Sequence, residues 1–172
     1  MAKKVNVFIT GVSGLIGQKI VERFSERNDI GLIIGIDIVE PPCYSDKIVF
    51  IKHDVRNNMV SVMSRYKIDW AIHAAFVVPV LRDKSVMEDI DINGTRNFFN
   101  ACGKLNVRHV IHLSSTTAYG AHKDNPSLLT EECELRGNEG FTYGKSKSEI
   151  ELGMARNFME NNPERLSDIL CK

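Results

Sequence analysis

The sequence lacks the features that mark several common protein classes. Lys and Arg together number 22, and Asp and Glu together also number 22, so no net charge favours a nucleic-acid or anionic-membrane partner. No apolar run approaches the length of a membrane-spanning helix, and the run that follows the basic N-terminus is too short for a secretory signal peptide. We therefore expect neither nucleic acid nor a membrane among the partners.

Cysteine is scarce, and its spacing matches neither a metal-ligand pattern nor a disulfide framework. This usage suits a reducing compartment, so we expect a cytoplasmic protein without a metal site. Repeats, low-complexity tracts and clear linkers are also missing, and 172 residues suffice for one domain with its own core. The four cysteines are Cys43, Cys102, Cys133 and Cys171.

Short β-type runs alternate with helical patterns, which predicts an α/β fold with a doubly wound parallel sheet covered on both faces. Expected strands lie at about 4–10, 31–37, 47–52, 69–75 and 107–113. Expected helices lie at about 14–27, 57–66, 82–104 and 141–161, with Gly94 as a candidate break and an irregular segment at about 118–140. A sixth strand begins near 166–170 and the chain stops there, so we expect a sheet that is truncated after the start of that strand.

A glycine-rich stretch joins the first expected strand to the first expected helix. Gly11 permits a tight turn, Gly14 would let a pyrophosphate approach the backbone, and Gly17 lets the helix pack close to the sheet. The free N–H groups at the positive end of the helix would face the phosphates. This context predicts a dinucleotide-binding turn, and the alternative is an ordinary βα turn that is rich in glycine. The remaining residues of this binding turn are Ser13, Leu15 and Ile16.

An acidic residue ends the second expected strand. Asp37 lies twenty residues after Gly17, where a dinucleotide-binding unit places the carboxylate that binds the adenosine ribose hydroxyls. This carboxylate would repel a 2′-phosphate, and no Arg or Lys occurs between Gly11 and Ile16 or immediately after Asp37. The pattern therefore favours NAD over NADP, while the alternative for Asp37 alone is a polar strand end.

A tyrosine and a lysine share one face of the last expected helix. Tyr143 and Lys147 are four residues apart, and a lysine ammonium beside a phenol favours the phenolate. The pair can therefore shuttle a proton, and Lys147 could also hold the nicotinamide ribose. The alternative is a packing tyrosine with a solvated lysine.

A serine supplies a third candidate for this chemistry. Ser115 follows the fifth expected strand, at the carboxyl edge of the sheet, where α/β folds bind ligands. A hydroxyl there can hydrogen-bond the substrate oxygen and orient it toward Tyr143. The alternative is a Ser/Thr-rich loop that satisfies nearby backbone groups.

Together, in this order, these motifs resemble the extended short-chain dehydrogenase/reductases, the NAD-dependent epimerase/dehydratase family that includes UDP-glucose 4-epimerase. The resemblance implies a Rossmann-type NAD-binding domain over residues 1–172 and a catalytic trio of Ser115, Tyr143 and Lys147. It also implies a small-molecule substrate, expected to be a nucleotide sugar. The motifs that carry it are Thr10–Gly17, Asp37, His53-Asp54-Val55, His73-Ala74-Ala75, Asn93-Gly94-Thr95, Ser114-Ser115, Tyr119-Gly120 and Tyr143–Lys147.

The resemblance implies further contacts with the cofactor. Asp54 would contact the adenine amino group, with Val55 beside it. Ala74 and Ala75 would line the cofactor near its ribose and pyrophosphate, and Asn93 would help to tie the central strands.

Family members also commonly pair two long helices across a two-fold axis, which implies a homodimer. In this chain the helices concerned would be those near 82–104 and 141–161. Their apolar content fits burial on two faces. The residues that suggest this are Phe98, Phe99, Leu152, Met154 and Phe158.

The resemblance leads us to expect an NAD-dependent epimerase/dehydratase reaction on a sugar nucleotide or a related alcohol. The apolar segment at 76–80 borders the expected substrate cleft, which keeps open an NAD-dependent alcohol dehydrogenase or carbonyl reductase of the same family. Family members continue into a substrate domain that is absent from these 172 residues. A non-catalytic dinucleotide-binding fragment is therefore the third possibility.

Overall fold

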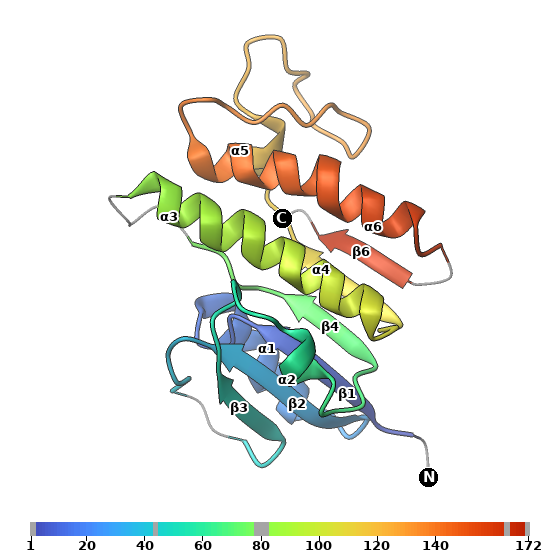
Figure 1. Cartoon of the computed structure of the whole chain (residues 1–172). Helices are drawn as coiled ribbons and strands as arrows, with labels where there is room; N and C mark the ends of the chain where they lie inside the picture. The colour runs from blue at the N-terminus through green and yellow to red at the C-terminus, as the bar shows by residue number, and fades with distance from the viewer. Residues whose placement is uncertain (1–2, 43–44, 78–82, 164–165, 171–172) are drawn as a thin grey trace.

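The computed structural model describes residues 3–42, 45–77, 83–163 and 166–170. Cys43, Cys171 and residues 78–80 of the apolar segment lie outside this described part. Six parallel strands form one sheet in the order β3-β2-β1-β4-β5-β6. The predicted doubly wound parallel sheet is confirmed (Figure 1). The strands are β1 (Val5–Thr10), β2 (Ile30–Asp37), β3 (Ile48–Lys52), β4 (Trp70–His73), β5 (His109–Leu113) and β6 (Leu166–Leu170).

Alternating side chains of the strands supply two hydrophobic cores. In β1, Phe8 packs into the core that also contains Phe98, whereas Val7 and Ile9 pack into the core that contains Val21. Successive side chains of a strand point to opposite faces of its sheet. Both faces of the central strands are therefore buried, which explains why these strands read as near-continuous apolar runs.

The helices form the covering layers. The helices α1 (Leu15–Ser25) and α2 (Val60–Met63) contribute to opposite cores, through Val21 and Val62. Two long helical stretches run side by side across the sheet in Figure 1 and meet through Phe99 and Phe158. One comprises α3 (Lys84–Glu88), the π-helical segment η1 (Asp89–Asn93) and α4 (Gly94–Lys104). The other comprises α5 (Thr142–Glu149), the π-helical segment η3 (Ile150–Ala155) and α6 (Arg156–Glu160).

Two local expectations differ from the structure. The helix expected near 57–66 is reduced to α2: the Asn58 side chain accepts from the Val60 N–H, which accounts for its start, and the α-helix ends after one turn at Met63. The candidate break at Gly94 is instead a π-helical segment that ends directly before this residue. A Cβ at Gly94 would lie 2.6 Å from Cγ2 of Val55, so glycine lets the helix approach the loop after β3.

The apolar residues taken as signs of a homodimer lie mostly inside the chain. Phe98, Phe99 and Phe158 belong to its own core, so they account for the inward faces of the two helices and give no support to a second buried face. Leu152 is 42% exposed and remains a candidate for an interface. Among the described residues, no helix has both the length and the apolar character of a membrane span.

Candidate functional site

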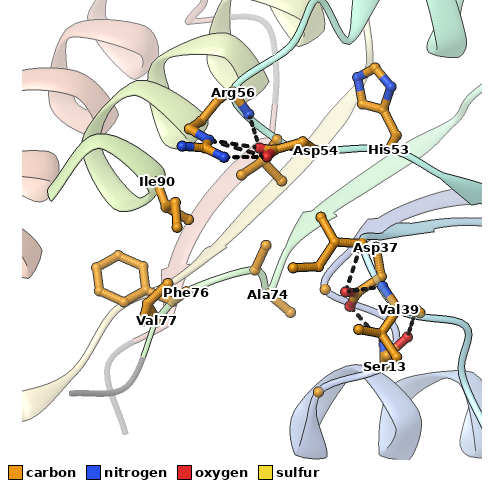
Figure 2. Close-up of a pocket in the computed structure, with 15 residues that line it drawn as sticks. Ser13, Asp37, Val39, His53, Asp54, Arg56, Ala74, Phe76, Val77 and Ile90 are labelled. Atoms are coloured by element: carbon orange, nitrogen blue, oxygen red, sulfur yellow. Dashed lines mark hydrogen bonds and ion pairs between the residues drawn. The ribbon is translucent and has the colours of Figure 1, made fainter. Parts of the chain in front are cut away.

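A cavity of about 460 Å³ opens at the carboxyl edge of the sheet. It lies at the switch point between β1 and β4, where the strand order reverses and open α/β sheets bind their ligands. Figure 2 shows Ser13 and Asp37 on one side of it, with Phe76, Val77 and Ile90 on the opposite side. The residues that line it are Gly11, Ser13, Gly14, Asp37, Ile38, Val39, His53, Asp54, Val55, Arg56, Ala74, Ala75, Phe76, Val77 and Ile90.

The glycine turn is held by close backbone packing. Gly11 has φ +74°, and a Cβ there would lie 2.6 Å from the backbone N of Ala75. A Cβ at Gly17 would lie 2.0 Å from the carbonyl oxygen of Gly11, so the turn of α1 that contains Gly17 sits directly on the loop. At Gly14 a Cβ would meet only the Gly11 carbonyl, at 3.3 Å. Gly14 is therefore the position of the three where neighbouring protein atoms restrict a side chain least.

The first two residues of α1 are exposed to solvent. Leu15 is 81% exposed and Ile16 is 55% exposed, although both are large apolar residues. Neither side chain lines the cavity, so any role in binding would come from the backbone at the helix start. The Ser13 hydroxyl donates to the Val39 carbonyl and joins the glycine turn to the loop after β2.

Asp37 organises the rim of the cavity opposite Phe76. Its Oδ2 accepts the Ser13 N–H at 3.0 Å, and its Oδ1 accepts the N–H of Ile38 at 2.7 Å and of Val39 at 3.3 Å. The bond to Ser13 joins the end of β2 to the glycine turn (Figure 2). Two carboxylate oxygens offer about four acceptor positions, so capacity remains for a ligand hydroxyl.

Arg56 is a cavity residue that the sequence reasoning missed. Its guanidinium binds the Asp54 carboxylate through Nε and Nη2 and reaches Asp89 at 3.3 Å. The hydrogen bond from Arg56 lowers the pKa of Asp54, and hydrogen bonds to Asp54 and Asp89 raise the pKa of Arg56. The expected adenine-contacting carboxylate is thus already paired with an arginine. The position of Arg56 directly after Val55 was the signal that could have revealed it.

The segment after β4 forms the opposite wall. The Ala75 N–H donates to Oγ1 of Thr10 at 3.2 Å, and the Val77 N–H donates to Oδ1 of Asp91 at 2.8 Å. Asp91 is only 2% exposed, and its burial raises the pKa of its carboxyl to about 7. The Val77 hydrogen bond and the charge of Lys147 oppose that rise. Asp91 was not among the sequence candidates.

Lys147 lies behind this wall and is 2% exposed. Its Nζ donates to the Leu113 carbonyl at 2.5 Å and lies 3.4 Å from the ring centroid of Phe76. The alternative of a solvated lysine is therefore wrong. The charge of Lys147 also reaches Asp91 and His73, whose pKa values it lowers.

Tyr143 lies beside the same aromatic ring. Its ring packs edge to face with Phe76, at 5.2 Å between centroids and 83° between planes. The Lys147 Nζ is 5.8 Å from the Tyr143 ring centroid. A Cβ at Gly144 would lie 2.7 Å from the Thr117 carbonyl, so this glycine lets α5 approach the segment after β5. The structure therefore brings Tyr143 and Lys147 to the Phe76 wall.

Ser115 caps the 3-10 segment η2 (Thr116–Tyr119) at the end of β5. Its Oγ accepts hydrogen bonds from the Thr117 N–H at 3.3 Å and from the Thr117 hydroxyl at 2.9 Å. The neighbouring Ser114 donates to the buried Glu151 at 2.6 Å, which joins this loop to η3. The loop after β5 and the α5–η3 helix are therefore fastened together one turn beyond Lys147.

Thr95, and not Asn93 as expected, makes the described side-chain hydrogen bond between α4 and β4. Asn93 donates to Asp89 at 2.6 Å and accepts from Arg96, so these hydrogen bonds stay within its own helix. Thr95 Oγ1 instead lies 3.0 Å from Nε2 of His73 in β4. His73 is fully buried, and desolvation lowers its pKa to about 3, so it links the helix to the strand as a neutral ring.

Known proteins share this architecture and part of the sequence. The UDP-Glc/GlcNAc 4-epimerase from Campylobacter jejuni aligns with a TM-score of 0.83 at 21% identity, over 97% of this chain and 53% of that chain. A UDP-glucose 4-epimerase from Bifidobacterium longum, solved in complex with NAD+ and UDP, aligns with a TM-score of 0.81 at 24% identity. That alignment covers 97% of this chain and 52% of the other. At these identities the likeness shows the fold.

A curated relative is more similar in sequence. The 3 beta-hydroxysteroid dehydrogenase/Delta 5-->4-isomerase of Monkeypox virus is 31% identical over 147 residues, which are 81% of this chain and 42% of the relative. The chain therefore spans less than half the length of this relative and about half the length of the solved chains.

The fold and the cavity define a Rossmann-type α/β protein with a cavity at its switch point. The chain belongs to the NAD dependent epimerase/dehydratase family, whose sequence pattern matches residues 7–161. Family membership agrees with the resemblance expected from the motifs.

Proposed function

We propose that the chain binds NAD in the cavity and carries the proton-transfer residues of an NAD-dependent reaction at a secondary alcohol. The observation that carries the proposal is that one side chain, Phe76, lines the cavity and also contacts Tyr143 and Lys147. The nucleotide site and the proton-transfer pair are thus joined by one side chain.

The residues present fit a dinucleotide. The backbone at Gly14 is open to a phosphate, and the N–H groups at the start of α1 lie at its positive end. Asp37, at the end of β2, would accept the adenosine ribose hydroxyls. Ala74 and Ala75 add small side chains where the cofactor would cross from β1 to β4. Asp54, Val55 and Arg56 would border the adenine end.

We assign the catalytic roles to Tyr143, Lys147 and Ser115. Tyr143 would exchange a proton with the substrate hydroxyl through its phenolic oxygen, and the ammonium of Lys147 lies 5.8 Å from the centroid of its ring. Ser115 already accepts two hydrogen bonds from Thr117, which leaves its own proton available to a substrate oxygen. Bound NAD would supply the hydride acceptor for this chemistry.

The first candidate reaction is of the epimerase/dehydratase type on a sugar nucleotide. The family and the fold support it, since two of the similar structures are named as UDP-glucose-type 4-epimerases. In such a reaction the ketone formed would be reduced again or dehydrated, so the reduced cofactor would not accumulate.

A simple dehydrogenase on an apolar alcohol is the second candidate. Phe76, Val77 and Ile90 give the cavity an apolar wall beside Tyr143. The curated viral relative is named a 3 beta-hydroxysteroid dehydrogenase/Delta 5-->4-isomerase. Such a reaction would accumulate NADH in proportion to product, which separates it from the first candidate.

Calorimetric titration of NAD into the 172-residue chain tests the binding step. We expect saturable binding that Asp37→Ala weakens, because the ribose contact is lost. A chain that remains folded by circular dichroism yet shows no heat of binding at millimolar NAD would contradict the proposal. A dinucleotide-binding unit without catalysis would bind NAD and show no turnover. Tyr143→Phe would then leave both properties unchanged. Tyr66→Phe, outside the cavity lining, is the matched control.

A further inference from the structure

Phe76 has an unusual combination of neighbours. Its side chain lines the cavity together with Val77 and Ile90 (Figure 2). The same ring lies 3.4 Å from Nζ of Lys147 and packs edge to face with the ring of Tyr143. One side chain therefore touches both the nucleotide cavity and the proton-transfer pair.

The environment of Lys147 explains what an aromatic ring adds there. The side chain is 2% exposed, and its ammonium donates to the Leu113 carbonyl at 2.5 Å. Removal of an ammonium from water is costly unless polar or π partners replace the lost hydration. The face of an aromatic ring attracts a cation, and the attraction is larger where both are desolvated. An aliphatic side chain of the same bulk would exclude water without supplying this attraction.

The backbone on both sides of Phe76 is anchored. The preceding residue, Ala75, donates its N–H to Thr10 Oγ1, and the following residue, Val77, donates its N–H to Asp91. Asp91 and Thr10 are both buried. These two hydrogen bonds hold the segment that carries the ring, so the position of the ring is set by the fold.

We propose that Phe76 is a positioning residue for Lys147: its ring holds the ammonium directly behind the cavity wall, next to the space that the nicotinamide ribose would occupy, and it places Tyr143 beside that ammonium. This inference rests on the proposed function, which assigns the cavity to NAD. Phe76 acts on the cofactor through Lys147 and need not react itself.

The test compares two ligands that share the adenosine diphosphate portion. ADP lacks the nicotinamide ribose, so its binding does not depend on Lys147. In Phe76→Leu, which keeps an apolar side chain but removes the π face, we expect NAD to bind about tenfold more weakly, as loss of a buried cation–π contact predicts. The Phe76→Leu variant should bind ADP within about twofold of the original affinity. Phe76→Tyr, a separate variant that keeps the aromatic face, should retain the NAD affinity of the original chain. Cooperative unfolding of each variant verifies that it is folded.

A double-mutant cycle separates an action through Lys147 from direct contact between Phe76 and NAD. In a Lys147→Met background, Phe76→Leu should change NAD binding by less than about twofold, because the cation is already absent. Phe141→Leu is the control, since the Phe141 ring also contacts Tyr143, at 5.9 Å, and the described contacts of Lys147 do not include it.

Each outcome decides between distinct conclusions. Additive losses in the cycle, or an equal loss for ADP and NAD in Phe76→Leu, would overturn the positioning role. Unchanged NAD binding in Phe76→Leu would overturn it while leaving the proposed function intact. Failure of the unaltered chain to bind NAD would instead remove the proposed function itself, and it is measured first by the same calorimetric titration.

Discussion

A Cβ atom on Gly17 would lie 2.0 Å from the carbonyl oxygen of Gly11, so no side chain fits at the point where α1 rests on the glycine turn. We expect Gly17→Ala to lower the free energy of unfolding by about 1–3 kcal/mol, because both the helix and the backbone of the turn would have to move. Urea denaturation measures the change. Gly153→Ala, in the helical segment η3 where a Cβ would meet nothing within 4 Å, should instead stabilise the chain by about 0.5–1 kcal/mol. Equal effects of the two substitutions would contradict the close contact.

The carboxyl group of Asp91 should make stability depend on pH. Burial raises its pKa to about 7 from the ordinary 3.8, so the folded chain binds more protons than the unfolded chain between these values. Its contribution to stability is therefore full below about pH 4 and is lost as the pH rises through 7. Asp91→Asn keeps an acceptor for the Val77 N–H and carries no charge. We expect it to be more stable than the original chain at pH 8 by about 1–3 kcal/mol.

The matching measurement is the free energy of unfolding from pH 5 to pH 8 for both proteins. The difference between them should grow over this range, because only the original chain ionises at residue 91. Asp29→Ala, at an exposed carboxylate paired with Arg27, serves as the control for general charge effects. A constant difference across the range would show that Asp91 is not the group responsible.

Cofactor preference should depend on Asp37. We expect NAD to bind more tightly than NADP, since the carboxylate would accept the ribose hydroxyls and repel a 2′-phosphate. Asp37→Ala should narrow that preference by about tenfold, through loss of both effects. Calorimetric titration with the two cofactors is the measurement.

Arg56 provides the second part of this experiment, because it is a cationic group on the cavity wall. Its pairing with Asp54 and Asp89 leads us to expect that Arg56→Gln changes the NAD-to-NADP preference by less than about threefold. Tighter binding of NADP than of NAD by the unaltered chain would refute the assignment of Asp37.

Self-association should involve the exposed face of the α5–α6 helical stretch if the homodimer expected from the family forms. Leu152, at 42% exposure, is the apolar side chain of that stretch available to a second copy. We expect Leu152→Glu to shift the mass measured by light scattering from dimer to monomer, because a desolvated carboxylate is costly at an interface. Leu128→Glu, on the irregular segment and 75% exposed, should leave the mass unchanged. A monomer at all concentrations of the unaltered chain would exclude the dimer.

The order of elements could be predicted from sequence, since the local periodicity of apolar residues and the glycine-rich turn indicate where strands and helices follow one another. The apolar runs around Phe8 and Ile34 predict strands that are buried on both faces, and the structure places these residues in the core. The positions of the glycine turn and of Asp37 could also be predicted, because their spacing within one βαβ unit determines which strand ends they occupy. The end of α2 at Met63 could not be predicted, because no glycine or proline marks it in the sequence.

The sequence by itself determined that a dinucleotide-type turn, an acidic strand end and a Tyr–Lys pair exist on a parallel α/β sheet. Only the tertiary structure decided how they are joined, because Phe76, Asp91 and Lys147 come from three separate elements whose contacts no local pattern encodes. It also decided that Arg56 pairs with Asp54 and that Thr95, in place of Asn93, meets His73. The physical reason is that burial, cation–π contact and desolvation depend on which atoms surround a group in space.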